Sequence, residues 1–592
     1  MKKKVWIILM VVTTIASSTQ AQSLRFEKAN TQTTGIFDDA GTRNIAFSKF
    51  KRRLFSTNAS TLEIELYGYQ DIFKPYLIKS MDVSSTLTKL HSLDAYNDLA
   101  VVTGDGNSPQ LSGKILFYDD QGNYLLQLST GPSPRHVRFT PDGSKVIVSN
   151  EGIPDSSYST DPLGSVSIIN LSVGLQNLTQ ANVKVVTFER LDTVAYDPMI
   201  RVYGNNGMQA PSRDIEPGAI AINNSSTKAY ISLQENNAIA IIDLFSGSLD
   251  TVVGIGYLDH SATGIDASDV AQNINIGTYG RLFGMHQPGG MAFISGNDSY
   301  LVTANTGAAR EYNGYNEVIR VKNQPVDPGD FNLTNNLTDS LLGRLKITQA
   351  LGDMTGNLLH DSLFSFGSRS ISVIDSSGME IWNSGDQIEQ TLATMHAANF
   401  NSTADSNNSY KNRSDDMGAE PEAVAVGEVD GVQYAFVALK KMGGIMIYNL
   451  SDPTSPQFEM YELNRNFSAM ANSPAAGDLG PSSLRFVPAS QTAEGIATLY
   501  IANEVSGTIS VYQAGQGIGI EELEPDESLY FYPNPSEGVF YTGQKGDYKV
   551  YNATGQLVKN IANRNRVDLS GEADGYYLIQ NENGTHLRIV KK

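Results

Sequence analysis

Three glutamates follow short apolar runs at equivalent points of a repeated segment: Glu151, Glu235 and Glu504. A second acidic set lies close to the prolines that open three of these segments. Its members are Asp214, Glu216, Glu420, Glu422 and Asp478. Gathered carboxylate oxygens suit Ca²⁺, which takes about six to eight oxygen ligands. These eight residues are therefore candidate metal-binding or ligand-binding residues.

A structural role explains the same acidic pattern. Acidic side chains at strand ends often accept backbone N–H bonds, and repeat-equivalent groups would then clamp neighbouring segments together. Clamping is the favoured of the two interpretations. Three arginines, Arg310, Arg369 and Arg413, are candidates to hold an anionic substrate, although pairing with a neighbouring Asp or Glu is the commoner role of a guanidinium.

The residues that are missing exclude several kinds of chemistry. The chain has no cysteine, which excludes disulfides, thiolate zinc sites and cysteine nucleophiles. It has no Gly-x-Ser-x-Gly, His-Glu-x-x-His, complete EF-hand or phosphate-loop motif, and its histidines show no paired metal-ligand spacing. The net charge of −20 comes without a concentrated basic surface, so nucleic acid is not expected as a partner.

The candidate residues belong to a degenerate repeat that must position them. Its clearest copy, residues 131–151 followed by 164–170, gives three short alternating strands divided by turn signals such as Pro141-Asp142-Gly143. Further copies begin at Pro217, Pro288, Pro421 and Pro481, and two weaker copies lie near 45–80 and 86–120. Sheets this small must stack radially to bury their faces. We expect an all-β, seven-bladed β-propeller, with the count open by one; a pair of β-sandwiches is the alternative.

Four insertions of uneven length interrupt the repeat, and insertions on one rim of a propeller often build binding surfaces. They cover residues 191–213, 245–285, 312–362 and 383–417. Within the last, residues 386–398 place Ile388, Leu392 and Met395 at a spacing that predicts a packed helix.

Both ends of the chain differ from the repeat. Residues 1–21 combine lysines, an apolar run and small residues before Ala21, which is typical of a cleavable signal peptide. No other stretch approaches the ~20 apolar residues of a membrane span. We expect the propeller over residues 22–514, a Gly- and Glu-rich linker over 515–527, and a small β-sandwich over 528–592.

The last domain carries several ordered motifs, including Tyr-Pro-Asn-Pro-Ser-Glu-Gly at 532–538 and the segments 549–558 and 575–578. It resembles the type A sorting domain of type IX secretion substrates. The matching residues include Pro533, Asn534, Pro535, Gly538, Gly555 and Gly575. The resemblance implies passage across the outer membrane by the type IX machinery, removal of this domain, and attachment to surface lipopolysaccharide or release.

The repeat region resembles the choice-of-anchor I family in collinear stretches that include 214–217, 233–240, 366–372, 412–422 and 502–507. The family shares a propeller-like core and is similar to mesenchyme-specific surface glycoproteins linked to biomineral deposition; some members are labelled alkaline-phosphatase-like. This chain departs from the family pattern at Asn305-Thr-Gly-Ala308 and at Lys440-Lys441, where two acidic positions are lost.

We therefore expect an exported protein of the outer cell surface whose propeller binds a ligand, a polysaccharide or a mineral ion. A Ca²⁺-dependent phosphatase or phytase-like hydrolase is the alternative, in which the metal polarises a phosphoryl oxygen and activates water. A scaffold within a larger surface complex is a third interpretation. The sequence leaves open whether the protein is an enzyme.

Overall fold

The computed structural model describes residues 24–204, 210–327, 337–516, 531–581 and 586–592, which form two units, one of them Leu24–Gln516. The predicted signal peptide, residues 1–21, and residues 517–527 of the predicted linker lie outside the described residues. None of the helices in the described ranges is long and apolar enough to cross a membrane.

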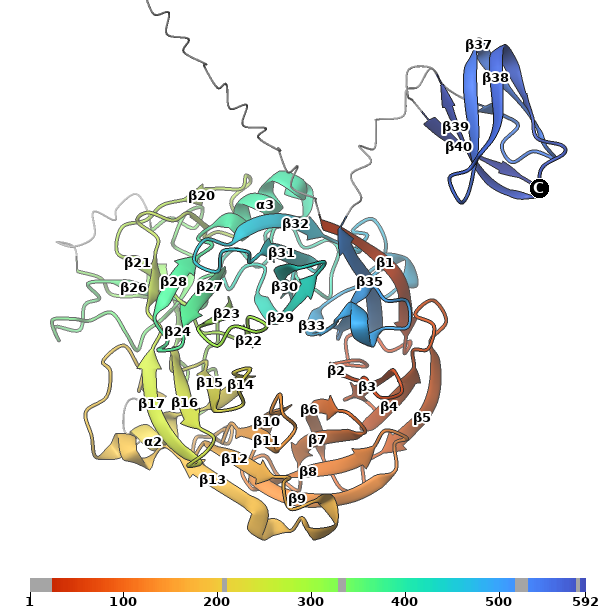
Figure 1. The fold of residues 1–592 in the computed structure, drawn as a ribbon. Helices are drawn as coiled ribbons and strands as arrows, with labels where there is room; N and C mark the ends of the chain where they lie inside the picture. The colour runs from red at the N-terminus through yellow and green to blue at the C-terminus, as the bar shows by residue number, and fades with distance from the viewer. Residues whose placement is uncertain (1–23, 205–209, 328–336, 517–530, 582–585) are drawn as a thin grey trace, which may run out of the picture. The chain divides into compact units, whose positions relative to one another are not determined.

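Seven four-stranded antiparallel sheets, the blades, build the first unit within the described residues (Figure 1). The innermost strands are β2 (Asn44–Ser48), β6 (Lys89–Tyr96), β10 (Pro134–Phe139), β14 (Pro217–Ile222), β22 (Gly290–Phe293), β29 (Pro421–Val429) and β33 (Pro481–Val487). The second strands are β3 (Arg53–Asn58), β7 (Leu99–Asp105), β11 (Lys145–Asn150), β15 (Lys228–Leu233), β23 (Tyr300–Asn305), β30 (Val432–Leu439) and β34 (Ala497–Asn503).

The outer half of each blade follows the same order. The third strands are β4 (Glu63–Gly68), β8 (Ser112–Asp119), β12 (Ser165–Asn170), β16 (Ala238–Asp243), β27 (Ser370–Asp375), β31 (Ile445–Asn449) and β35 (Thr508–Gln516). The outermost strands are β5 (Tyr76–Asp82), β9 (Tyr124–Pro132), β13 (Val183–Thr187), β17 (Ser248–Gly254), β28 (Glu380–Asn383), β32 (Gln457–Glu462) and β1 (Leu24–Thr33).

The ring of blades is closed. Each innermost strand contacts the innermost strand of the next blade, and β33 contacts β2. The last blade takes its outermost strand from the start of the unit, since β1 pairs with β35, and the two lie side by side in Figure 1. These contacts confirm the seven-bladed propeller and exclude the paired β-sandwiches.

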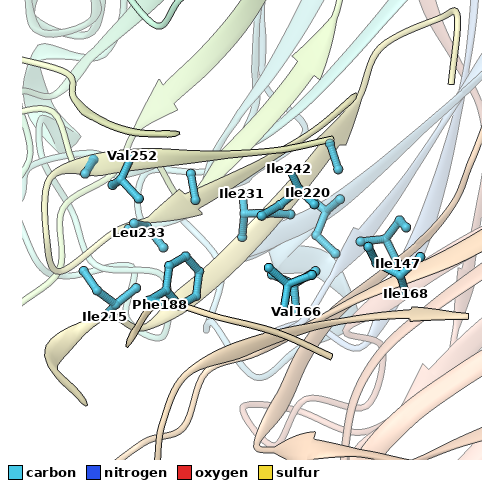
Figure 2. Packing of buried hydrophobic residues seen from close by; sticks show 14 of the residues in the cluster. Ile147, Val166, Ile168, Phe188, Ile215, Ile220, Ile231, Leu233, Ile242 and Val252 are labelled. Carbon is cyan, nitrogen blue, oxygen red and sulfur yellow. The ribbon is translucent and has the colours of Figure 1, made fainter. Parts of the chain in front are cut away.

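Neighbouring blades bury apolar side chains against each other. Ile147 and Val166 of one blade pack in a common cluster with Ile220, Ile231 and Ile242 of the next, all less than 5% exposed (Figure 2). Burying a side chain of this size contributes roughly 1.5–3 kcal/mol relative to leaving it exposed. Since no blade can bury these faces alone, the stability of each blade depends on its neighbours.

Burial explains which strands the sequence pattern revealed. The second and third strands, such as β15 and β16, are buried along almost their whole length and read as apolar runs. The outermost strands β5 and β17 each contain a single buried residue and carry mixed sequences. The sequence therefore indicates three strands per blade, and the structure adds a fourth.

The insertions contain further elements. One five-stranded sheet is formed by β18 (Tyr257–Asp259), β21 (Leu282–Met285), β26 (Leu363–Ser365), β25 (Lys346–Thr348) and β24 (Val318–Arg320), and β19 (Ile265–Asp266) pairs with β20 (Ile276–Gly277). Short α2 (Pro211–Asp214) lies before β14. Single 3₁₀ turns are η1 (Leu175–Asn177), η2 (Gln180–Asn182), η3 (Glu189–Asp192), η4 (Val321–Asn323), η5 (Ala397–Asn399), η6 (Pro474–Ala476) and η7 (Ala489–Gln491).

The helix predicted over residues 386–398 is α3 (Gln387–Met395). Ile388 and Leu392 are fully buried in a core cluster, as the spacing predicts. Met395 is 53% exposed, because it is the last residue of the helix and lies beyond the packed part of this face.

The C-terminal unit is a small all-β domain with its own core. Its strands are β36 (Phe531–Tyr532), β37 (Val539–Asn552), β38 (Leu557–Asp568), β39 (Gly575–Asn581) and β40 (His586–Lys591). Long β37 pairs with β36, β38 and β39 around buried Phe540 and Val550. Of the predicted motif residues, Pro533, Asn534 and Pro535 connect β36 to β37, and Gly538, Gly555 and Gly575 all have positive φ angles.

Candidate functional site

A cavity in the centre of the ring is lined by residues of all seven innermost strands or their immediate neighbours. These are Asn44, His91, Arg135, Gly218, Gly290, Ala423 and Ser483. The cavity is therefore the central channel of the propeller. Glu151, Glu235, Glu422 and Glu504 also line it.

Three of the predicted acidic residues converge at this channel. Each of Glu151, Glu216 and Glu235 offers a carboxylate oxygen, and these oxygens all lie within 4.8 Å of one another. Two oxygens bound to one Ca²⁺ at about 2.3–2.6 Å are at most about 5 Å apart. The spacing of this acidic triad therefore fits a single cation.

Local hydrogen bonds place the triad. Glu151 comes directly after β11, where the Asn150 side chain donates to Ser165 and Ser167 and fixes the strand end. Glu235 follows β15, and the next residue, Asn236, ties the segment before β14 to this turn. Its amide donates to the Asp214 carbonyl at 2.8 Å, and its oxygen accepts the Glu216 N–H at 3.3 Å. Asparagines beside Glu151 and Glu235 thus hold the backbone, and these two glutamates line the channel.

Arg310 lies on the buried side of the triad. It follows β23 and is 1% exposed. Its Nη2 lies 2.9 Å from Glu216 Oε1 and donates to the Asp214 carbonyl at 2.8 Å, and its Nη1 pairs with the Asp214 carboxylate. Asp214 also accepts the N–H groups of Tyr203 and Gly204 at 2.9 and 2.8 Å. The Asp214 carboxylate is therefore occupied by donors, and its role in this arrangement is to orient Arg310.

The rim insertions supply the support for Arg310. Glu317 accepts the Arg310 N–H at 2.9 Å and pairs with Arg201 at 2.6 Å. The Tyr203 ring contacts both arginines, with its centre 4.0 Å from the Arg201 guanidinium carbon and 4.8 Å from that of Arg310. Buried charges are stable when they are paired and hydrogen-bonded. Both guanidiniums are paired through their Nη atoms, whereas Arg201 Nε and Arg310 Nε have no hydrogen-bond partner among the described residues.

The triad carries more negative charge than its neighbours neutralise. Burial raises the pKa of Glu216 well above its ordinary value, Arg310 opposes this shift, and Glu235 and Glu151 add to it. Burial, followed by the charge of Glu151, raises the pKa of Glu235 to about 7. Among the described residues, no Lys, Arg or His forms an ion pair with Glu235. A bound cation would relieve this repulsion, since an opposite charge stabilises the ionised carboxylates.

The other two channel glutamates are neutralised by a lysine. Lys440 Nζ lies 3.4 Å from Glu422 and 3.2 Å from Glu504, and Arg43 Nε lies 3.9 Å from Glu504. Lys440 follows β30 at the point where Glu151 and Glu504 follow their own strands. A lysine at this repeat position thus produces an ion-pair cluster, separate in its contacts from the triad.

Two of the predicted anion-binding arginines are engaged by protein groups. Buried Arg369 pairs with Glu389 at 2.5 Å and donates to the Ser414 carbonyl at 2.8 Å. Arg413 pairs with Glu420 at 2.5 Å and with Asp416 at 3.0 Å.

Asp478, the remaining predicted acidic residue, also makes local contacts. It accepts hydrogen bonds from Asn464 at 2.5 Å and from Thr508 at 3.0 Å. Asp478, Glu420, Arg369 and Arg413 therefore hold loops and strands together in this structure, and none of them belongs to the triad.

The sequence analysis missed three cations of the channel: Arg43, Arg135 and Arg138. Arg135 Nε lies 4.0 Å from Glu151, and the charge of Glu151 is the main factor that raises the Arg135 pKa, with Glu422, Glu235 and Glu504 adding to it. Arg43 lines the same cavity. The signal for Arg135 was its place directly after Pro134 in the repeat frame, where two other blades carry Gly218 and Glu422.

Comparison with protein families finds two matches. The choice-of-anchor I domain matches residues 43–453, and the secretion system C-terminal sorting domain matches residues 530–592. The first match covers most of the propeller and the second covers the C-terminal unit.

Two curated animal proteins are similar to parts of the chain. Gigasin-3a of Magallana gigas is 29% identical over 185 residues, which cover 29% of this chain and 65% of that protein. The mesenchyme-specific cell surface glycoprotein of Strongylocentrotus purpuratus is 28% identical over 309 residues, 45% of this chain and 39% of that protein. The chain thus matches less than two thirds of the length of either relative.

Solved propellers are similar at low identity. Virginiamycin B lyase from Staphylococcus aureus has a TM-score of 0.40 at 12% identity and covers 83% of this chain and 99% of that one. The Cps50 (Swd1) β-propeller domain of Myceliophteria thermophila has a TM-score of 0.40 at 9% identity, covering 82% and 99%.

Proposed function

Because this chain belongs to the choice-of-anchor I domain family and carries a type IX sorting domain, it is an exported protein of the cell surface, and we propose that its propeller binds Ca²⁺ through Glu151, Glu216 and Glu235. The convergence of three carboxylates from two adjacent blades within 4.8 Å is the observation that supports this proposal. Oxygen-only ligands favour Ca²⁺ over Zn²⁺ or Cu²⁺, which prefer nitrogen and sulfur.

The surroundings of the triad favour binding of a cation from outside. Glu151 and Glu235 are half-buried and face the channel, whereas Glu216 is 3% exposed and fixed by Arg310. The site therefore combines one rigid carboxylate with two that solvent can reach. The cation links two blades of the ring, so its binding is expected to stabilise the folded propeller.

The direct test is calorimetric titration of the purified full chain with CaCl₂, together with thermal unfolding in the presence and absence of the ion. At about a hundredfold excess over the dissociation constant, the ion should raise the free energy of unfolding by about 2.7 kcal/mol. Glu235→Gln should abolish most of this gain, because it removes one anionic ligand and nearly preserves the volume.

Glu189→Gln is the matched control, since Glu189 is an exposed glutamate of η3 outside the channel. It should bind Ca²⁺ like the unmodified chain. Equal binding by both variants, or no binding by the unmodified chain at millimolar Ca²⁺, would overturn the proposal.

A second candidate is hydrolysis of a phosphate ester with the help of the bound cation. It is favoured by Arg135, a cation that lines the channel beside Glu151 and has the geometry to hold a phosphoryl group. The assay is release of nitrophenol from p-nitrophenyl phosphate with and without Ca²⁺. Turnover that requires both Ca²⁺ and Arg135 supports the hydrolase; Ca²⁺ binding without turnover leaves a binding module.

A further inference from the structure

A second cavity lies at the other end of the central channel. The acidic triad's cavity touches the first residues of the innermost strands, such as Gly218 and Gly290. The second cavity touches the last residues of the same strands, including Phe139, Ile222 and Phe293. It holds about 440 Å³, within the roughly 300–1,000 Å³ typical of small-molecule pockets.

The charge at this second mouth is positive. Its charged residues are Lys49, Arg138 and Arg485, opposed by the single carboxylate of Asp94. Arg485 Nη1 lies 3.8 Å from Asp94 Oδ1, and Asp94 Oδ2 accepts the Phe139 N–H at 2.9 Å. In a chain whose net charge is −20, this mouth is a local exception. The field of such a mouth draws in anions.

Arg138 is the residue of this mouth whose positive charge is least balanced by the protein. It stands between the two cavities and lines both. Its guanidinium donates to the Val137 carbonyl at 3.1 Å, and no carboxylate of the described residues lies within ion-pair distance of it. A guanidinium carries five N–H donors in a planar fork that matches carboxylate, sulfate and phosphate oxygens.

Burial is the main factor that lowers the pKa of Arg138; the charge of Asp94 opposes this effect, and the charge of Arg485 adds to it. An anion held between Arg138 and Arg485 would offset the repulsion between the two cations.

Two partly exposed aromatic residues complete the wall. Tyr96 and Phe486 line the cavity, and Lys49 Nζ lies 5.7 Å from the centre of the Tyr96 ring. The other aromatic residues of the lining, Phe47, Phe139 and Phe293, are at most 9% exposed. Partly exposed rings beside convergent cations suit a ligand that combines a ring with an anionic group. We propose that this mouth binds an acidic sugar unit, whose carboxylate or sulfate group pairs with Arg138 and Arg485 while its ring lies against Tyr96 and Phe486.

The experiment is calorimetric titration of the full chain with four probes: glucuronate, glucose 6-sulfate, glucose and sodium sulfate. The two acidic sugars should bind and glucose should not. Arg138→Gln should weaken binding of the acidic sugars by about tenfold or more, because charge-assisted hydrogen bonds are lost. Asp94→Asn should tighten binding, since it removes the one opposing charge and keeps an acceptor for the Phe139 N–H.

Arg190→Gln, a change of an exposed arginine of η3 that lines neither cavity, is the control and should bind like the unmodified chain. Glu235→Gln should also leave sugar binding unchanged, so that failure of this site and failure of the calcium site can be told apart. Binding of glucose as tight as that of glucuronate, or equal binding by Arg138→Gln and Arg190→Gln, would overturn the proposal. Binding of free sulfate as tight as that of glucose 6-sulfate would overturn the assignment to a sugar.

Discussion

Glu216 and Glu235 differ in what balances their charge. Glu216 is fixed and partly neutralised by Arg310, whereas Glu235 faces the channel with Glu151 as its close charged neighbour. Burial raises the pKa of both carboxylates, that of Glu216 well above its ordinary value and that of Glu235 to about 7. Because Ca²⁺ must displace protons from these ligands, the calcium affinity of the propeller should rise with pH.

We expect the dissociation constant for Ca²⁺ to fall as pH rises from 5 to 8, with the steepest change near the Glu235 pKa of about 7. This pKa is raised from 4.5, so the metal-free folded state binds an extra proton between these values. Its free energy of unfolding should accordingly fall as pH rises through this range. Titrations at several pH values check both trends, and equal affinity at pH 5.5 and pH 8 would contradict them.

The triad was only partly predictable from sequence. Glu151 and Glu235 follow from their repeat position, and Glu216 follows from its place beside Pro217. The same rule selected Glu504, which in the structure pairs with Lys440. Which carboxylates meet depends on which blades are neighbours and on the cations between them, and neither is encoded within one repeat.

Among the elements, strand β1 has the largest effect on the architecture. It closes the ring by pairing with β35, and Phe26 stacks on Tyr512 with ring centres 4.7 Å apart. The repeat frame did not reveal it, because β1 is an outermost strand that lies far in sequence from the blade it completes. The innermost, second and third strands of the blades were predictable, because their apolar alternation recurs along the repeat.

Phe26→Ala should lower the free energy of unfolding by about 3–5 kcal/mol, since Phe26 is 5% exposed and its loss leaves a cavity at the closure. Arg25→Ala is the control on the opposite, exposed face of the same strand and should change stability by less than about 0.5 kcal/mol. Chemical denaturation measures both. Similar stabilities for the two variants would show that β1 is not required for closure.

At the scale of the whole molecule, the chain combines a propeller, for which we propose binding, with a unit for export. The propeller holds the triad and the basic mouth, and the C-terminal unit holds the sorting motifs. The sequence predicted this division because the motifs of residues 532–578 are local, whereas both channel sites required the closed ring.

Deletion of residues 528–592 should keep the protein from reaching the cell surface, because the sorting domain is what the type IX machinery recognises. Immunoblots of cell-surface and intracellular fractions measure the result. The truncated chain, once purified, should still bind Ca²⁺. Surface display of the truncated chain at the level of the full chain would contradict the role assigned to this domain.

The most direct measurement is anomalous X-ray diffraction from crystals of the full chain soaked in CaCl₂. We expect one anomalous peak in the channel, about 2.3–2.6 Å from carboxylate oxygens of Glu151, Glu216 and Glu235. The peak should be absent from crystals of Glu235→Gln. The absence of an anomalous peak at the triad at millimolar Ca²⁺, or a peak found only elsewhere on the propeller, would contradict the account.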